Sequence, residues 1–322
     1  MSGLPPDLRA AIADYAEGMD TREQTRRAAA LSETYRAGGT SGAIASEADV
    51  AAYLTARMPA TYAAVAAALK QARARAPGFE PRSLLDAGAG PGTASWAALG
   101  AWPGIGEVTM FDRNPRLIAA ARRLAEASGH ETLRHAHILT GDLAAPRLQS
   151  EYDLVIAAYA LTELPANGVA EAVSALWRCC RGVLVVVEPG TPSGFARMLQ
   201  CRERLLTEQA RIAAPCPGDY RCPIVAPDWC HFAVRLRRSR DHMRAKSATV
   251  PFEDEKFSYF AAARETVAFA PARPRVLTEP HASKPGLRLK LCADGALRDE
   301  TVPKRDRTAY KAVAKKKWGD VL

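Results

Sequence analysis

The sequence lacks both an apolar run long enough to cross a membrane and a secretory signal. Its longest apolar runs, LVIAAYAL and GVLVVVEP, have the length of strands, whereas a spanning helix needs about 20 residues. The opening residues, MSGLPPDLRAAIADY, carry early acids and no apolar segment. We therefore expect a cytoplasmic protein with no membrane partner. The oligomeric state stays open, with a monomer as the working expectation.

Closely spaced cysteine pairs are also missing. The chain has seven cysteines, an odd number, and none of them forms the C-x2-C pairs typical of zinc ribbons. A cytoplasmic location further argues against a framework of disulfides. Cys179 and Cys180 lie at the end of an apolar helical stretch, so we expect them to be packing residues.

Acidic residues are outnumbered by basic ones. Lys and Arg total 44 against 35 Asp and Glu, and the net charge of +9 suits a polyanionic partner. Two segments concentrate this charge. The first basic cluster, RLRRSRDHMRAK (235–246), has six bases and one acid, and the second basic cluster, KRDRTAYKAVAKKKW (304–318), has seven bases and one acid. Such clustering indicates a nucleic-acid partner.

The chain divides into three regions. Residues 1–78 are Ala-rich with apolar side chains at helical spacing, which predicts a helical N-terminal region with a flexible break at GGTSGAIAS. Over 79–195, strand-length apolar runs alternate with helical stretches, which predicts an α/β core with a parallel sheet covered on both faces. Residues 196–322 hold a Cys- and Pro-rich insertion, candidate strands ETVAFAP, RPRVLTEP and LRLKLCAD, and a basic C-terminal tail.

A glycine loop joins the first predicted strand to a helix in LLDAGAGPGTASWAALG. Gly88, Gly90 and Gly92 are spaced G-x-G-x-G, tighter than the G-x-G-x-x-G of dinucleotide sites. Asp86 ends the strand, and a carboxylate there suits a ligand with a cationic amino group rather than a diphosphate. S-adenosylmethionine is such a ligand.

Acids also end the next two predicted strands. Asp112, at the end of EVTMFD, would accept hydrogen bonds from ribose hydroxyls, and Asp142, in TGD, would face the adenine. The order of glycine loop, Asp112 and Asp142 closely resembles that of the class I methyltransferases, which have a Rossmann-like sheet. A nicotinamide-dependent oxidoreductase is the nearest alternative, and the glycine spacing disfavours it.

The fourth predicted strand does not reveal a methyl acceptor. Its continuation, AAYALTELP, lacks the Asn/Asp-Pro-Pro-aromatic turn of methyltransferases that act on base amines. Glu163 is the candidate general base. The alternative is that Glu163 begins a helix, which is the more common role of a Glu in this position.

The segment CPGDYRCPIVAPDWCH places Cys216, Cys222 and Cys230 among prolines. Prolines prevent regular structure, so a bound metal would help to hold the segment in shape. A nucleophilic Cys216, of the kind that 5-methylcytosine enzymes use, is an alternative. Its distance from the fifth predicted strand disfavours that role.

A tetrahedral metal site needs a fourth ligand. Cys292, in LRLKLCADG, is our choice, with Cys201 and His231 as alternatives. Sulfur ligands suit both an iron–sulfur cluster and zinc, so the residues alone do not decide between them.

These motifs together resemble a family of methyltransferase-like proteins that is associated with assembly of the mitochondrial small ribosomal subunit and has bacterial relatives. The cysteine segment followed by FEDEKFSYF is its most specific part. The resemblance runs from about residue 53 to 320, through YLTARMPATYAAV, LLDAGAGPGTASWAA, LTELP, VEPGTPSGF, APCPGDYRCPIVAPDWCHF, FEDEKFSYF, LKLCADG and KKKWGD.

The resemblance implies a [4Fe–4S] cluster on Cys216, Cys222, Cys230 and Cys292, with zinc as the alternative. It also implies binding to the small ribosomal subunit and its rRNA. Because the N-terminal region has no Arg/Ser-rich presequence, a bacterial cytoplasm is the expected location. One departure is Gly218, where the family is expected to have a histidine.

Two functions follow from this pattern. The first is an S-adenosylmethionine-dependent rRNA methyltransferase, and the second is a non-catalytic assembly factor that uses the fold and the cluster to bind rRNA.

The stretch FEDEKFSYF is predicted to begin a helix with acids in its first turn. A cation site or a knot of ion pairs is the alternative for this stretch.

Overall fold

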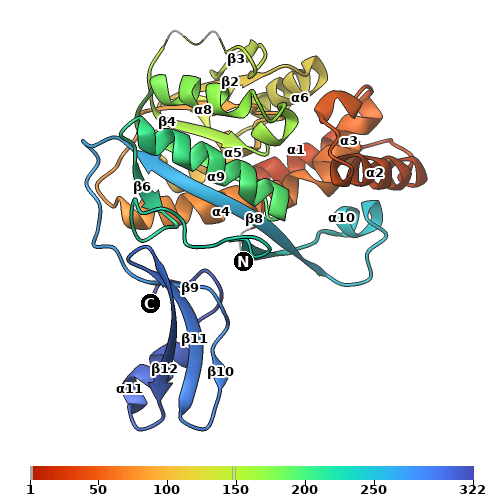
Figure 1. The fold of residues 1–322 in the computed structure, drawn as a ribbon. Coiled ribbons are helices and arrows are strands. Elements are labelled where there is room, and N and C mark those ends of the chain that lie inside the picture. Colours follow the sequence, from red (N-terminus) through yellow and green to blue (C-terminus); the bar gives the residue numbers. More distant parts are fainter. Residues whose placement is uncertain (1–2, 147, 149) are drawn as a thin grey trace.

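The computed structural model describes residues 3–146, 148 and 150–322 (Figure 1). Residues 6–75 form the helices that their apolar spacing predicts: α1 (Pro6–Ala16), α2 (Thr21–Arg36), α3 (Glu47–Ala56) and α4 (Met58–Arg75). Side-chain hydrogen bonds cap the N-termini of two of these helices. Asp20 accepts backbone hydrogen bonds at the start of α2, and Ser46 forms a capping box with Asp49 at the start of α3. The predicted flexible break contains a 3-10 turn, Ser41–Ala43.

Strands and helices then alternate, as predicted. The elements are β1 (Ser83–Ala87), α5 (Thr93–Ala101), β2 (Glu107–Asp112), α6 (Pro115–Glu126), α7 (Glu131–Arg134), β3 (His137–Thr140), β4 (Tyr152–Ala158), α8 (Val169–Arg178), β5 (Cys180–Pro189) and α9 (Pro192–Thr207). Strands β3-β2-β1-β4-β5 pair in that order and are all parallel.

The region beyond residue 195 completes this sheet. Strand β8 (Phe252–Ala263) pairs antiparallel with β5 and with β6 (Arg211–Ala214), and its first half pairs with β7 (Phe232–Arg237). The helix α10 (Arg240–Ala245) lies between β7 and β8 in the chain. The sheet is therefore mixed rather than wholly parallel. The order β3-β2-β1-β4-β5-β8-β6 with β8 reversed is that of a class I methyltransferase-like fold.

The helix predicted at FEDEKFSYF was wrong, because this stretch is the first part of β8. Its acidic residues alternate in burial and pair with β7, where Arg235 lies opposite Asp254 in the antiparallel register. Long-range pairing thus overrides the local acidic pattern that suggested a helix start.

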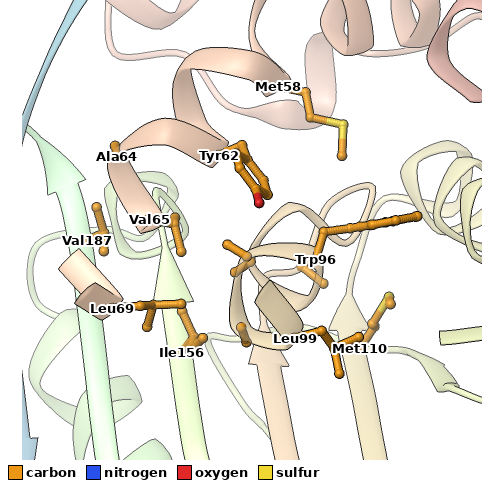
Figure 2. Close-up of a cluster of buried hydrophobic side chains, with 14 of the residues drawn as sticks. Met58, Tyr62, Ala64, Val65, Leu69, Trp96, Leu99, Met110, Ile156 and Val187 are labelled. Atoms are coloured by element: carbon orange, nitrogen blue, oxygen red, sulfur yellow. The ribbon is translucent and has the colours of Figure 1, made fainter. Parts of the chain in front are cut away.

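Alternate residues of the strands point to opposite faces of the sheet. Leu84 and Ile156 belong to one buried cluster, and Leu85 and Val155 belong to another. Helices α4 and α5 cover the first face, where α4 side chains meet α5 and the sheet (Figure 2); the labelled residues are Met58, Tyr62, Ala64, Val65, Leu69, Trp96, Leu99, Met110, Ile156 and Val187. Helices α8 and α9 cover the second face.

A small C-terminal unit, residues 275–322, lies below the α/β body in Figure 1. It contains β9 (Arg275–Val276), β10 (His281–Ala282), β11 (Gly286–Ala293), β12 (Ala296–Pro303) and α11 (Arg307–Ala314). Val313 of α11 packs on Leu287, Leu289 and Leu291 of the sheet. The basic tail expected here is therefore a strand and a helix, and ETVAFAP forms a turn and irregular chain instead of a strand.

Candidate functional site: the glycine-loop pocket and the cysteine cavity

The first candidate site is a pocket at the carboxyl ends of the parallel strands, where α/β sheets bind ligands. We call it the glycine-loop pocket. It is lined by six of the predicted site residues, which are Asp86, Gly88, Gly90, Asp112, Asp142 and Glu163. Gly92 lies outside the lining; its φ of 82° lets the chain turn into α5.

Asp86 fixes the start of α5. Its Oδ2 accepts hydrogen bonds from both the backbone N and the Oγ of Ser95, each at 2.8 Å. The side chain is almost fully buried, and this burial raises the pKa of Asp86 to about 7. The carboxylate thus forms the polar floor of the pocket.

The glycine loop wraps around the end of β2. Gly88 N donates to Phe111 O at 2.7 Å, and Gly90 N donates to Asp112 Oδ2 at 2.8 Å. Gly88 has a φ of 74°, and a Cβ there would lie 2.3 Å from Ala160 Cβ. The amides of Gly88 and Gly90 are therefore engaged by Phe111 O and the Asp112 side chain instead of remaining free for a diphosphate.

Asp112 and Asp142 both line the glycine-loop pocket, and their predicted roles at the ribose and the adenine stay predictions. Asp112 Oδ1 accepts from Asn114 N at 2.8 Å, so its orientation is fixed from both oxygens, and burial raises its pKa. Asp142 is at the rim, and its Oδ1 accepts from Ala144 N at 2.9 Å. Carboxylates held in this way keep lone pairs for hydroxyl and amine donors.

The N-terminal helices supply a wall of the pocket that the sequence did not predict. Tyr35, Ser41, Tyr53 and Arg57 all line it. A hydrogen bond holds Ser41 in place, because Asn114 Nδ2 donates to Ser41 O at 2.8 Å. The capping residues around GGTSGAIAS were the available signal that this segment is ordered.

Glu163 also holds the segment around Ser41 in place. Its Oε1 accepts from Ser41 N at 2.8 Å and its Oε2 from Ser41 Oγ at 2.7 Å. Arg113 lies 3.3 Å from Oε2. Burial raises the pKa of Glu163, although these donors oppose the rise. The general-base role stays a prediction, and the contacts made here are structural.

Tyr159 lines the pocket directly after β4, the stretch in which the sequence offered no acceptor turn. It follows β4 with a φ of 57°, which is uncommon outside glycine. Its hydroxyl donates to Glu255 Oε1 at 2.9 Å, and Arg57 lies over its ring with 5.0 Å from Cζ to the centroid. Arg57 also pairs with Glu255 at 3.2 Å. FEDEKFSYF thus does form ion pairs, and one of them lies at this pocket.

The second candidate site is a cavity on the other side of β8, which we call the cysteine cavity. Four predicted ligands line it together: Cys216, Cys222, Cys230 and Cys292. The first three come from the irregular segment between β6 and β7, and Cys292 comes from β11 of the C-terminal unit. The structure thus brings together residues far apart in sequence.

The alternative ligands lie elsewhere. Cys201 is fully buried in α9 and is absent from the cavity lining. His231 stacks between Trp229 and Trp318, with ring centroids 5.2 and 4.8 Å away. Cys179 and Cys180 are buried in the core beneath α8, as predicted for packing residues.

The thiols of the cavity influence one another. Burial, together with the neighbouring Cys216 and Cys222, raises the pKa of Cys292 to about 11. Burial and the other three cysteines raise the pKa of Cys230 well above its usual value.

All seven cysteines are free. Throughout the described residues, no group of three or more His, Cys, Asp or Glu side chains is close enough to hold a single metal ion. The donor set itself, four soft sulfur atoms around one cavity, suits iron or zinc.

The two basic clusters differ in how their charge is balanced. In the first, Arg235 pairs with Asp254 at 2.7 Å, and Arg238 and Lys246 pair with Glu253 at 3.3 and 2.5 Å. In the second, no base forms an ion pair within the described part of the chain, and these bases are Lys304, Arg305, Arg307, Lys311, Lys315, Lys316 and Lys317. Free positive charge therefore concentrates on the C-terminal unit.

Among the described residues, no helix combines the length and apolarity needed to cross a bilayer.

Residues 47–322 match the family described as Mitochondrial small ribosomal subunit Rsm22. The chain is 30% identical over 288 residues to the ribosome assembly protein METTL17, mitochondrial, of Homo sapiens, covering 84% of this chain and 61% of that protein. It is 27% identical over 325 residues to the mitochondrial Rsm22-cox11 tandem protein 2 of Schizosaccharomyces pombe, covering 85% of this chain and 43% of that protein. The chain thus spans less than two thirds of either relative.

Two of the solved structures with a similar course of the chain are methyltransferases. Magnesium protoporphyrin IX methyltransferase from Synechocystis gives a TM-score of 0.43 at 16% identity, over 64% of this chain and 84% of that one. Precorrin-6y C5,15-methyltransferase from Geobacter metallireducens gives 0.41 at 16% identity, over 63% and 86%. The strand order, rather than these likenesses, identifies the fold.

Proposed function

Since the chain belongs to the Rsm22 family, we propose that it assists assembly of the small ribosomal subunit by binding S-adenosylmethionine and small-subunit rRNA. The observation that carries the first part is the ring of carboxylates around the glycine-loop pocket. S-adenosylmethionine has a cationic sulfonium and ammonium group, a ribose with two hydroxyls and an adenine amine. Asp86, Asp112 and Asp142 would face these donors in turn, which is the complement that a cationic nucleoside requires.

A metal group in the cysteine cavity is the second part of the proposal. Cys216, Cys222, Cys230 and Cys292 would hold a [4Fe–4S] cluster, with zinc as the alternative. A cluster would supply one-electron redox chemistry or a rigid cross-link, and zinc would supply only the cross-link. What supports a metal group is the donor set, since four cysteine side chains from distant parts of the chain line one cavity and sulfur ligands suit both iron and zinc.

The unpaired charge of the second basic cluster supports rRNA binding by the C-terminal unit. The test replaces Lys311, Lys315 and Lys317 by Gln and measures binding of a small-subunit rRNA transcript at several salt concentrations. We expect weaker binding and a salt slope smaller by about 0.7–0.9 for each phosphate that the variant no longer neutralises. The matched control replaces Arg235 and Arg238, which are already paired with acids. An equal decrease in affinity in both variants would refute this assignment of the RNA surface.

Methyl transfer to RNA is the second candidate function, because the cofactor pocket has every expected acid. The Tyr159–Glu255–Arg57 contacts instead favour a non-catalytic factor, since they engage the stretch after β4 in which the sequence offered no acceptor turn. A deletion strain separates the two. A methylated rRNA nucleotide that disappears on deletion and returns with the wild-type gene would support the enzyme. Normal subunit assembly restored by Gly90→Arg, which blocks the pocket, would support the non-catalytic factor.

A further inference from the structure

Two arginines line the cysteine cavity, and both are buried. Arg202, in α9, has 1% of its surface exposed, and Arg275, in β9, has 7%. Neither forms an ion pair with a carboxylate anywhere in the described chain. A buried cation without a counter-charge costs several kcal/mol, so its presence requires an explanation.

Arg202 has hydrogen-bond donors to spare. Its Nη2 donates to Tyr220 O at 2.7 Å and to Gly218 O at 3.2 Å. Its Nε and Nη1 are buried and have no partner among the described residues. A guanidinium has five N–H donors in a fixed fork. The Nε and Nη1 donors of Arg202 are therefore available to a group bound in the cysteine cavity.

Arg275 is held more completely. Its Nε donates to Pro215 O at 3.0 Å, and its Nη1 donates to Gln71 Oε1 at 3.0 Å and Gly319 O at 2.8 Å. In the antiparallel register, Arg275 lies directly opposite Cys292. Residues paired in this way project to the same face of the sheet, so the guanidinium is fixed beside a cavity thiol.

We infer that Arg202 and Arg275 are positioning residues that neutralise an anionic metal–thiolate group in the cysteine cavity. A [4Fe–4S] core of charge 2+ on four thiolates, or a zinc ion on four thiolates, has a net charge of about −2, which two guanidinium groups balance. Four neutral thiols, or two disulfides, would leave both cations uncompensated. The unused N–H groups of Arg202 would donate to sulfur, one of the contacts that set a cluster's potential. This inference rests on the proposed metal group.

The test uses the full chain purified without oxygen, as wild type, Arg202→Met and Arg202→Lys. Iron, sulfide and zinc per chain are measured, followed by the metal affinity against a competing chelator and, for a cluster, its reduction potential. We expect Arg202→Met to bind the metal about 10- to 100-fold more weakly. Its cluster potential should shift to more negative values, because the reduced cluster carries an additional negative charge. Arg202→Lys keeps the charge and should stay close to wild type in potential.

Arg264→Met is the matched control. Arg264 also donates to two backbone carbonyls, those of Cys180 and Trp177, both at 2.7 Å, but it lies outside the cavity. Its replacement should leave metal affinity and potential unchanged, whatever it does to stability. If Arg202→Met lowers the yield of folded protein, the rise of the unfolding midpoint on metal loading is compared instead. That rise should be smaller in Arg202→Met than in wild type.

The outcomes separate the role of the arginines from the metal site itself. A wild-type protein that holds metal, with unchanged affinity and potential in Arg202→Met, overturns the role of the arginines and leaves the metal site standing. A wild-type protein that holds no iron, sulfide or zinc, even after reconstitution, overturns the proposed metal group and this inference with it.

Discussion

The glycine-loop pocket and the cysteine cavity differ in the charge that the protein places around them. Asp86 and Asp112 are buried carboxylates at the first site, and Arg202 and Arg275 are buried guanidinium groups at the second. Burying either kind of charge costs free energy, and a ligand of opposite charge recovers it. The two sites therefore suit ligands of opposite charge, which in our proposal are a cationic nucleoside and an anionic metal–thiolate group. If so, each site can be altered without affecting the other.

The largest effect is expected from Gly90→Arg. A Cβ at Gly90 would meet only Leu117, at 3.8 Å, although the φ of 54° makes any side chain there strained. The added guanidinium would fill the pocket and attract the carboxylates meant for the ligand. We expect S-adenosylmethionine affinity to fall at least about 100-fold in calorimetry, with metal content unchanged. Gly18→Arg is the control, because Gly18 has a φ of 77° and open space around it, and it lies outside the pocket. Retained affinity in Gly90→Arg would remove the pocket from the cofactor assignment.

The reciprocal change is Cys292→Ser. A serine hydroxyl is a poor ligand for iron or zinc, so we expect metal per chain to fall below about half. The affinity for S-adenosylmethionine should stay within about twofold, because the two sites share no residue. Cys201→Ser serves as the comparison, since Cys201 lies in α9 outside the cavity lining. An equal decrease in metal content in both variants would identify Cys201 as a ligand after all.

The third effect is a pH dependence confined to the glycine-loop pocket. Burial raises the pKa of Asp86 to about 7, so the carboxylate that would attract a cation becomes protonated below neutrality. Affinity for S-adenosylmethionine should fall about tenfold from pH 8 to pH 6. The stability of the free protein should follow the opposite trend and fall as the pH rises from about 4 to about 7, since its folded state binds the proton more tightly. Calorimetry with Asp86→Asn should give a flat profile over about pH 6 to 8; a profile as steep as wild type would assign the titration to another group.

The smallest effect is expected from Glu163→Gln. The substitution weakens the contacts to Ser41 and the ion pair with Arg113, which are together worth about 1 kcal/mol. Affinity for S-adenosylmethionine should fall about twofold to fivefold, and metal content should not change. A general base would respond differently, because its removal would slow methyl transfer by about 10²–10⁴-fold. A methylation assay on rRNA therefore decides the role of Glu163.

Local patterns predicted the elements that depend on neighbours in the chain. The strand at Ser83–Ala87, the glycine loop and the acids after the next strands all lie where periodicity and turn chemistry require them. Proline spacing correctly indicated irregular chain around Cys216 and Cys222. The three domain boundaries and the bacterial cytoplasmic location stay predictions.

Long-range pairing accounts for what the sequence did not reveal. The acids of FEDEKFSYF lie in a strand because this stretch pairs with β5 and β7, with Arg235 opposite Asp254, and no local signal identifies those partners. The wall that Ser41 contributes to the pocket depends on Asn114 and Glu163, which are 73 and 122 residues away. Arg202 and Arg275 carry no motif, and only the fold places them beside the thiols.

The origin of Cys292 in the C-terminal unit has a mechanical consequence. Three of the cavity cysteines belong to the α/β body, and the fourth is joined to it through residues 264–274. This connection packs on the body, since Val267 and Phe269 join its core cluster and Ala270 N donates to Arg75 O at 2.8 Å. In our proposal, an occupant bound to all four cysteines would add a second connection between the two parts. The second basic cluster would then be held more firmly relative to the α/β body when the cavity is filled.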